Sequence, residues 1–142
     1  MQIVIGGAFN GKAEWVKDNY EASHPLEWIN LRENEAFNLS EAKESILVFQ
    51  GIEEWTKIYL KDHSIDGARE IFREWIQELL NWEKKKDQHH LILIANDISK
   101  GIVPVDKKDR DWRDLTGWFY QDLVEEAERV DEIWYGISRQ LK

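Results

Sequence analysis

The residues with the clearest chemical potential lie near the start of the chain. The stretch GGAFNGKA at positions 6–13 follows the apolar run QIVI and matches the pattern G-x-x-x-x-G-K-[ST] at every fixed position except the last. Glycines let such a loop turn tightly and point its N–H groups at phosphate oxygens, a lysine adds a mobile positive charge, and the helix that follows adds its positive dipole end. The predicted nucleotide-binding residues are Gly6, Gly7, Ala8, Phe9, Asn10, Gly11, Lys12 and Ala13. Lys12 is the predicted catalytic residue; the alternative is a glycine-rich turn that binds nothing.

Two positions do not suit magnesium, one in this loop and one at the end of a later apolar run. Ala13 stands where a hydroxyl group would coordinate the ion. Gln50 ends the apolar run at 45–49, where an acidic side chain would be expected. We therefore expect no built metal site and a Mg²⁺ contribution to nucleotide binding that is weak or absent. The sequence leaves open whether a nearby acid takes that role: Glu53, Glu54 or Asp97.

A second informative stretch covers residues 95–123, ANDISKGIVPVDKKDRDWRDLTGWFYQDL. It is typical of a strand end, a loop with glycine and proline, and a helix. In parallel α/β folds the loops at the carboxyl ends of strands build the ligand crevice, so this loop should share a rim with the glycine loop. The candidate rim residues are Asn96, Asp97, Arg110 and Arg113. The alternative is a surface loop with solvated charges.

The elements that would position these residues follow from hydrophobic periodicity. Five apolar runs without polar alternation indicate buried strands at 2–5, 26–31, 45–49, 90–95 and 132–137. Helical patterns fill the gaps at 12–22, 52–62, 65–86 and 109–130. The strand–helix alternation predicts a three-layer α/β fold of the phosphate-loop NTPase class, with a mainly parallel five-stranded sheet and the first strand central.

Composition narrows the functional class. The 142 residues suggest one nucleotide-binding domain spanning 1–142. A formal net charge of −9 disfavours nucleic acid as a partner but allows a single nucleotide, because a phosphate loop uses local N–H groups. With no cysteine, disulfides and thiolate metal sites are excluded. No signal peptide and no apolar run of the ~20 residues that a membrane helix needs is visible, so we expect a cytoplasmic protein without a membrane partner.

Several of these segments, in order, carry a family resemblance. The sequence resembles the adenosylcobinamide kinase/adenosylcobinamide-phosphate guanylyltransferase family of cobalamin biosynthesis, of which it looks like a short, divergent member. The segments that carry the resemblance are IVIGGAFNGKA, ILIANDISKGIVP, RDWRDLTGWFYQ and DEIWYGISRQLK, with a weaker match at ILVFQGIEEW. The resemblance implies a kinase or transferase that binds ATP or GTP, a cobinamide-like small molecule as acceptor, and a homo-oligomer.

The departures from the family pattern leave two hypotheses open. The loop serine is Ala13, the strand-end aspartate is Gln50, and the region before residue 45 is too short for the helix with the histidine that is guanylylated. His24 is the only histidine near that region, and it precedes a proline at a turn. Under the first hypothesis the chain is a kinase that has lost the guanylyltransferase half. Under the second it is a catalytically degenerate paralogue that acts as a binding or regulatory module.

Overall fold

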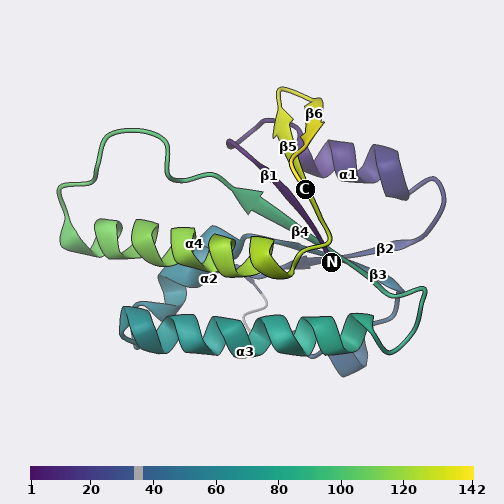
Figure 1. Ribbon diagram of the computed structural model, residues 1–142, viewed down its shortest axis with the longest axis horizontal. Helices are drawn as coiled ribbons and strands as arrows, with labels where there is room; N and C mark the ends of the chain where they lie inside the picture. Colours follow the sequence, from purple (N-terminus) through teal and green to yellow (C-terminus); the bar gives the residue numbers. More distant parts are fainter. Residues whose placement is uncertain (34–36) are drawn as a thin grey trace.

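The computed structural model describes residues 1–33 and 37–142, which form one continuous six-stranded sheet with helices on both faces (Figure 1). The strands are β1 (Gln2–Gly6), β2 (Leu26–Asn30), β3 (Ile46–Gln50), β4 (His90–Asn96), β5 (Arg129–Trp134) and β6 (Ile137–Gln140). Their order is β2-β3-β4-β1-β5-β6, parallel throughout except for β6. The predicted class, a mainly parallel phosphate-loop NTPase fold with the first strand central, is confirmed.

The helices make the sheet the middle of three layers. They are α1 (Lys12–Tyr20), α2 (Ile52–Tyr59), α3 (Ile65–Glu83) and α4 (Lys107–Glu126), with a short 3₁₀ turn, η1, at Leu39–Glu41. Figure 1 shows α1 on one face and α2, α3 and α4 on the other. Val16 of α1 packs with Val4 and Ile94 in one buried cluster, while Phe72 and Phe119 join the cluster on the opposite face. Burial on both faces explains why the strands read as continuous apolar runs.

The sheet has six strands instead of the predicted five, because the residues predicted as one strand at 132–137 span a hairpin. β5 ends at Trp134 and β6 begins at Ile137, which pairs with it. The two residues between them, Tyr135 and Gly136, have φ values of 49° and 81°. Positive φ at both positions is the signature of a tight hairpin turn, so the chain reverses within one apolar run.

The helix predicted at 109–130 begins and ends earlier in the structure than the sequence pattern indicated. α4 begins at Lys107, with the side chain of Asp106 capping the N–H of Lys108. It ends at Glu126, because Ala127 is already extended and Arg129 starts β5. The other helices agree with the predicted ranges at their starts and end two or three residues early. Within residues 1–33 and 37–142, no helix combines the length and the apolar character needed to cross a membrane.

Two neighbouring strands create the place for a ligand. β1 and β4 lie side by side, but β1 leads into α1 on one face and β4 leads toward α4 on the other. Chain segments that leave adjacent parallel strands over opposite faces open a crevice at the carboxyl edge of the sheet. The strand ends stay together there, since the N–H of Asp97 donates to the carbonyl of Gly6 at 2.9 Å.

Candidate phosphate-binding site

The glycine loop connects β1 directly to the first turn of α1. Gly11 sits at the helix N-cap with φ 87° and has no side chain that could cap the helix. The N–H of Trp15 makes the first helical bond, to the carbonyl of Gly11 at 2.9 Å. The N–H groups of the first turn, at residues 12–14, therefore lie at an uncapped helix start, the kind of position that binds anions.

The C-terminal hairpin braces this loop. The N–H of Gly136 donates to the carbonyl of Asn10 at 2.9 Å, and Asn10 Nδ2 donates to the carbonyl of Ile133 at 3.4 Å. At the start of the loop, a Cβ added to Gly6 would lie 2.3 Å from that same Ile133 carbonyl. Gly6 is therefore needed for the close approach of β1 to β5, and the hairpin holds the loop from outside.

Lys12 reaches back across the loop instead of into solvent. Its side chain is 6% exposed, and Nζ donates to the carbonyls of Gly6 and Gly7 at 3.2 and 2.7 Å. Burial lowers the pKa of Lys12, and the nearby carboxyl group of Glu53 raises it in part. The lysine therefore keeps the loop curved around a positive charge.

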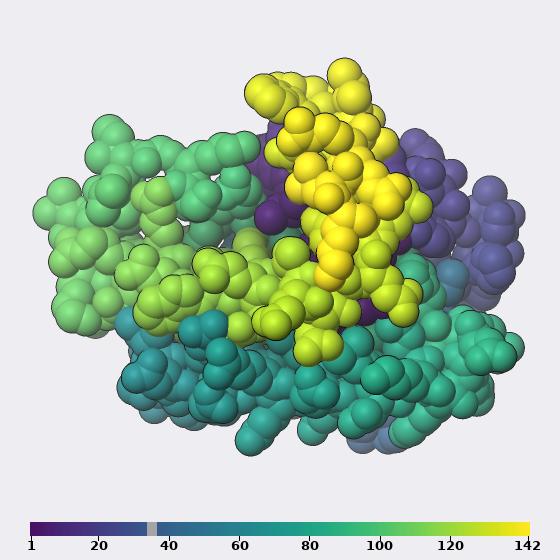
Figure 2. Space-filling model, in the orientation of Figure 1, coloured from purple at the N-terminus to yellow at the C-terminus, as the bar shows by residue number. Residues whose placement is uncertain are grey.

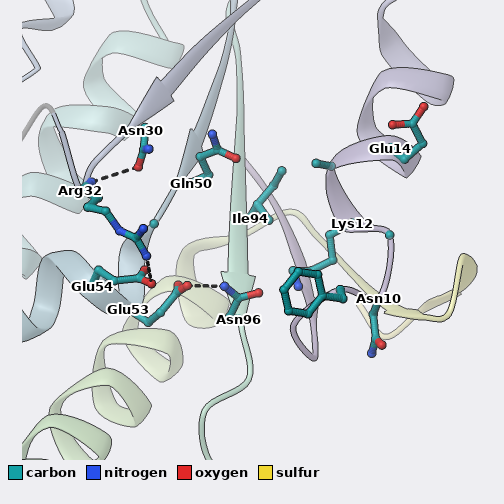
Figure 3. A pocket seen from close by; sticks show the side chains of 14 residues that line it. Asn10, Lys12, Glu14, Asn30, Arg32, Gln50, Glu53, Glu54, Ile94 and Asn96 are labelled. Carbon is teal, nitrogen blue, oxygen red and sulfur yellow. Dashed lines mark hydrogen bonds and ion pairs between the residues drawn. The ribbon is translucent and has the colours of Figure 1, made fainter.

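A cavity of about 490 Å³ opens beside the loop (Figure 3). One wall is the glycine loop with the start of α1; the other is formed by the ends of β2, β3 and β4 and the start of α2. The lining residues are Phe9, Asn10, Gly11, Lys12, Ala13, Glu14, Asn30, Arg32, Gln50, Gly51, Glu53, Glu54, Ile94 and Asn96. Five predicted loop residues and Asn96 therefore meet at one cavity. Gly6 and Gly7 do not line the cavity, but their carbonyls accept the hydrogen bonds that hold Lys12 in place. Ala8 is an exposed loop residue.

The wall that faces the loop carries a chain of polar contacts. Arg32 is paired with Glu54, and Asn96 Nδ2 donates to Oε1 of Glu53 (Figure 3). Glu53 is 4% exposed, and its backbone carbonyl accepts a hydrogen bond from Trp112 Nε1 at 2.6 Å. This contact ties the wall to α4, which packs behind it.

The two adjacent carboxyl groups titrate in opposite directions. Burial raises the pKa of Glu53, which the hydrogen bond from Asn96 offsets only in part. Burial also disfavours charge on Glu54, but the neighbouring Glu53 carboxyl group and the guanidinium of Arg32 outweigh burial and lower the pKa of Glu54. The wall therefore holds one acid that resists ionisation beside one that stays ionised.

The other predicted rim residues stabilise their own segment. Asp97 Oδ1 accepts the N–H of Ser99 at 2.9 Å, and Oδ2 lies 3.4 Å from Lys100 Nζ. Arg110 and Arg113 donate to backbone carbonyls of the 99–105 segment, those of Pro104 and Val105 and those of Ser99 and Ile102 respectively. Asp97, Arg110 and Arg113 do not line the cavity. They fix the segment that leads from β4 into α4.

The donor set does not fit a magnesium ion held in the manner of an intact phosphate loop. Ala13 and Gln50 both line the cavity and provide neither a hydroxyl group nor a charge. Glu54 is already paired with Arg32, and Glu53 Oε2 is fully buried. Across the part of the chain that the structure describes, no three His, Cys, Asp or Glu side chains gather as a metal site would require.

Sequence reasoning did not identify the contribution of β2. Asn30 is the last residue of that strand and Arg32 follows it; both line the cavity. Asn30 Oδ1 accepts the N–H of Arg32 at 3.2 Å, which sets the backbone from which Arg32 reaches Glu54. The available signal was a polar residue at the carboxyl end of a buried strand, the same signal that identified Asn96.

The fold and the cavity together define a phosphate-loop NTPase domain. Comparison with known proteins gives the family: residues 16–141 match the model of the cobinamide kinase / cobinamide phosphate guanyltransferase family, and the chain belongs to that family. The chain is also similar to the bifunctional adenosylcobalamin biosynthesis protein CobP of Pseudomonas aeruginosa. The two are 28% identical over 130 residues, which cover 87% of this chain and 70% of the relative. The sequence-based family resemblance is thereby confirmed.

Proposed function

We propose that the chain binds the phosphates of ATP or GTP in the cavity beside Lys12. The observation that carries this proposal is the placement of an uncapped helix start and a buried lysine at the edge of a cavity of about 490 Å³. Backbone N–H groups and Lys12 would hold the β- and γ-phosphates. Arg32, on the opposite wall, is a further cation within the same cavity.

As a member of its family, the chain would act as a kinase on a cobinamide-like alcohol. The hydroxyl oxygen of the acceptor would attack the γ-phosphorus while the bond to the β–γ bridging oxygen breaks, and the hydroxyl proton would leave to solvent or a base. Catalysis of this transfer rests on positioning and electrostatic stabilisation. Lys12 would supply the positive charge at the transferred group.

Calorimetric titration with ATP and with GTP tests the binding step directly. Titrations in EDTA and in excess Mg²⁺ would show whether either nucleotide binds and how much the metal contributes. Incubation of [γ-³²P]-labelled ATP or GTP with adenosylcobinamide would then test transfer to the alcohol. Failure of both nucleotides to bind under either condition would refute the proposed function.

We do not expect guanylyltransferase activity, the second activity in the family's name, in this chain. His24 is exposed and lies just before β2, at the amino edge of the sheet, whereas the cavity lies at the carboxyl edge. His63, His89 and His90 also lie outside the cavity lining. Covalent guanylylation needs a nucleophile beside the bound nucleotide. Protein incubated with [α-³²P]GTP should therefore stay unlabelled; a stable label on His24 would contradict this expectation.

The second candidate function is a binding or regulatory module without turnover. It is favoured by Ala13 and Gln50, which remove two ligands for the same ion. Nucleotide binding without transfer to adenosylcobinamide, in either EDTA or Mg²⁺, would select this candidate over the kinase.

A further inference from the structure

The wall of the cavity that faces Lys12 contains a buried acid, Glu53, that forms no ion pair with any residue the structure describes. Glu53 is 4% exposed, and its Oε2 is fully buried with no hydrogen-bond donor reaching it from residues 1–33 or 37–142. Lys12 donates to the carbonyls of Gly6 and Gly7 instead. An ionised carboxylate buried without a paired cation is strongly unfavourable, so the geometry itself favours the neutral acid.

The neighbouring acid shows where a proton resides. The carboxyl group of Glu54 lies close enough to that of Glu53 for each to shift the other's pKa, raising that of Glu53 and lowering that of Glu54. Glu54 pairs with the guanidinium of Arg32, so it is the ionised partner. Glu53 is therefore the acid that holds a proton, and its Oε1 accepts a hydrogen bond from Asn96 Nδ2.

The protonation state of Glu53 determines the net charge that the cavity presents to a polyphosphate. The charged groups that line the cavity with Glu53 are Lys12 and Glu14 from α1, Arg32 after β2 and Glu54 on α2, and the titratable groups Asp97 after β4 and Tyr120 on α4 lie nearby. Asp97 is paired with Lys100, and burial raises the pKa of Tyr120 so that it stays neutral. With Glu53 neutral, Lys12 and Arg32 balance the other two acids of the cavity lining, Glu14 and Glu54; with Glu53 ionised, the lining has a net negative charge, which opposes a polyphosphate.

We propose that Glu53 enters the nucleotide complex as a neutral carboxylic acid, so that polyphosphate binding requires a proton on Glu53 in place of a divalent metal ion. This inference rests on the proposed nucleotide-binding function and names the residue that permits it without magnesium. It follows from the poor fit to Mg²⁺ at Ala13 and Gln50 together with the orphaned oxygen of Glu53.

The test is calorimetric titration of the full chain with inorganic tripolyphosphate in EDTA, from about pH 5.5 to 8.5. Binding should weaken as pH rises, by at most about tenfold per pH unit, because ionisation of Glu53 opposes the ligand. Glu53→Gln is neutral at every pH, so it should bind tighter than the unmodified protein at the high end and show only the titration of the ligand itself. Glu14→Gln removes an exposed acid from the same cavity and should keep the original pH dependence.

A second measurement needs no variant. Titrations of the unmodified protein across the same pH range, in buffers of different ionisation enthalpy, should show proton uptake on binding that begins where the affinity falls and exceeds the uptake by Glu53→Gln. Equal pH dependence and equal proton uptake in the two proteins would overturn this inference while leaving nucleotide binding intact. So would binding that needs Mg²⁺ and is abolished by Glu53→Gln. Absence of binding by every variant at every pH would refute the proposed function itself.

Discussion

At the scale of single residues, Lys12 donates to two carbonyls of its own loop, and bound phosphates would compete for the same donor. A charge-assisted contact of this kind contributes roughly 1.5–3 kcal/mol. Lys12→Ala should therefore weaken ATP or GTP binding by about ten- to a hundredfold, measured by calorimetry. Lys17→Ala is the matched control, since Lys17 lies on the same helix outside the cavity and should leave affinity unchanged.

Glu83 links stability to pH at the opposite edge of the sheet. Burial disfavours its charge, but hydrogen bonds from His90, the Met1 amino group and the N–H of Leu91 outweigh burial and lower the pKa of Glu83 to about 2. A depressed carboxyl pKa stabilises the fold above its unfolded value of 4.5, and this contribution is lost as pH falls from there toward 2.

We therefore expect the free energy of unfolding to fall by about 1–2 kcal/mol between pH 5 and pH 3 from this group alone, after allowing for solvent screening. Urea denaturation at several pH values measures this. Glu83→Gln should be less stable at neutral pH and should show a shallower acid dependence. An equally steep dependence in the variant would show that other carboxylates carry the effect.

At the scale of elements, the contact between β1 and β5 depends on Gly6. A Cβ there would meet the Ile133 carbonyl at 2.3 Å, so Gly6→Ala must displace one strand or the loop. We expect a loss of about 1–3 kcal/mol in unfolding free energy by urea denaturation, together with weaker nucleotide binding. Gly117→Ala is the control, because a Cβ within α4 has no heavy atom within 4 Å; it should gain about 0.5–1 kcal/mol. Equal effects of the two substitutions would contradict the close approach.

At the scale of the whole molecule, exposed apolar side chains gather at the carboxyl edge of the sheet. We call them the apolar rim: Phe9, Ile102, Val103, Val105, Trp134, Tyr135 and Ile137, each at least 62% exposed. Figure 2 shows the segments that carry most of them, the C-terminal hairpin in yellow and the green 97–106 segment, projecting from the surface. Lys100 Nζ lies 5.9 Å from the ring centre of Trp134, which places the two segments near each other. A monomer rarely exposes a large contiguous apolar patch.

We therefore propose that the apolar rim is buried in a homo-oligomer, as the family resemblance implies. Sedimentation velocity should give a mass above the 16.9 kDa of one chain. The double variant Ile102→Asp/Tyr135→Asp should shift the protein to a monomer, because a charge in an apolar interface is costly. Trp118→Gln, on α4 where the ring lies beside Arg69 of α3 and outside the apolar rim, should leave the mass unchanged. A monomeric unmodified protein would exclude this proposal.

The sequence by itself determined the layers of this fold and the position of its loop. Strands buried on both faces must be apolar throughout, so the bounds of β1 to β4 could be predicted to within one residue at each end. The glycine spacing located the turn into α1. Prediction from hydrophobic periodicity failed at two places, where the backbone changes direction or conformation within a continuous apolar pattern. The apolar run at 132–137 hides a reversal at Tyr135 and Gly136, and the apolar spacing of α4 continues past Glu126 although the backbone becomes extended.

The composition of the cavity was decided only by the tertiary structure. Asn30, Gln50 and Asn96 end three strands that are far apart in sequence, and the parallel register of β2, β3 and β4 brings those ends to one edge. Which nearby acid would face the loop could not be read from spacing: Glu53 and Glu54 line the cavity, whereas Asp97 pairs with Ser99 and Lys100 outside it. Periodicity fixes which face a side chain occupies, but strand order and crossover geometry fix its neighbours. The pair of acids opposite Lys12, of which Glu53 is buried, is therefore a property of the folded chain.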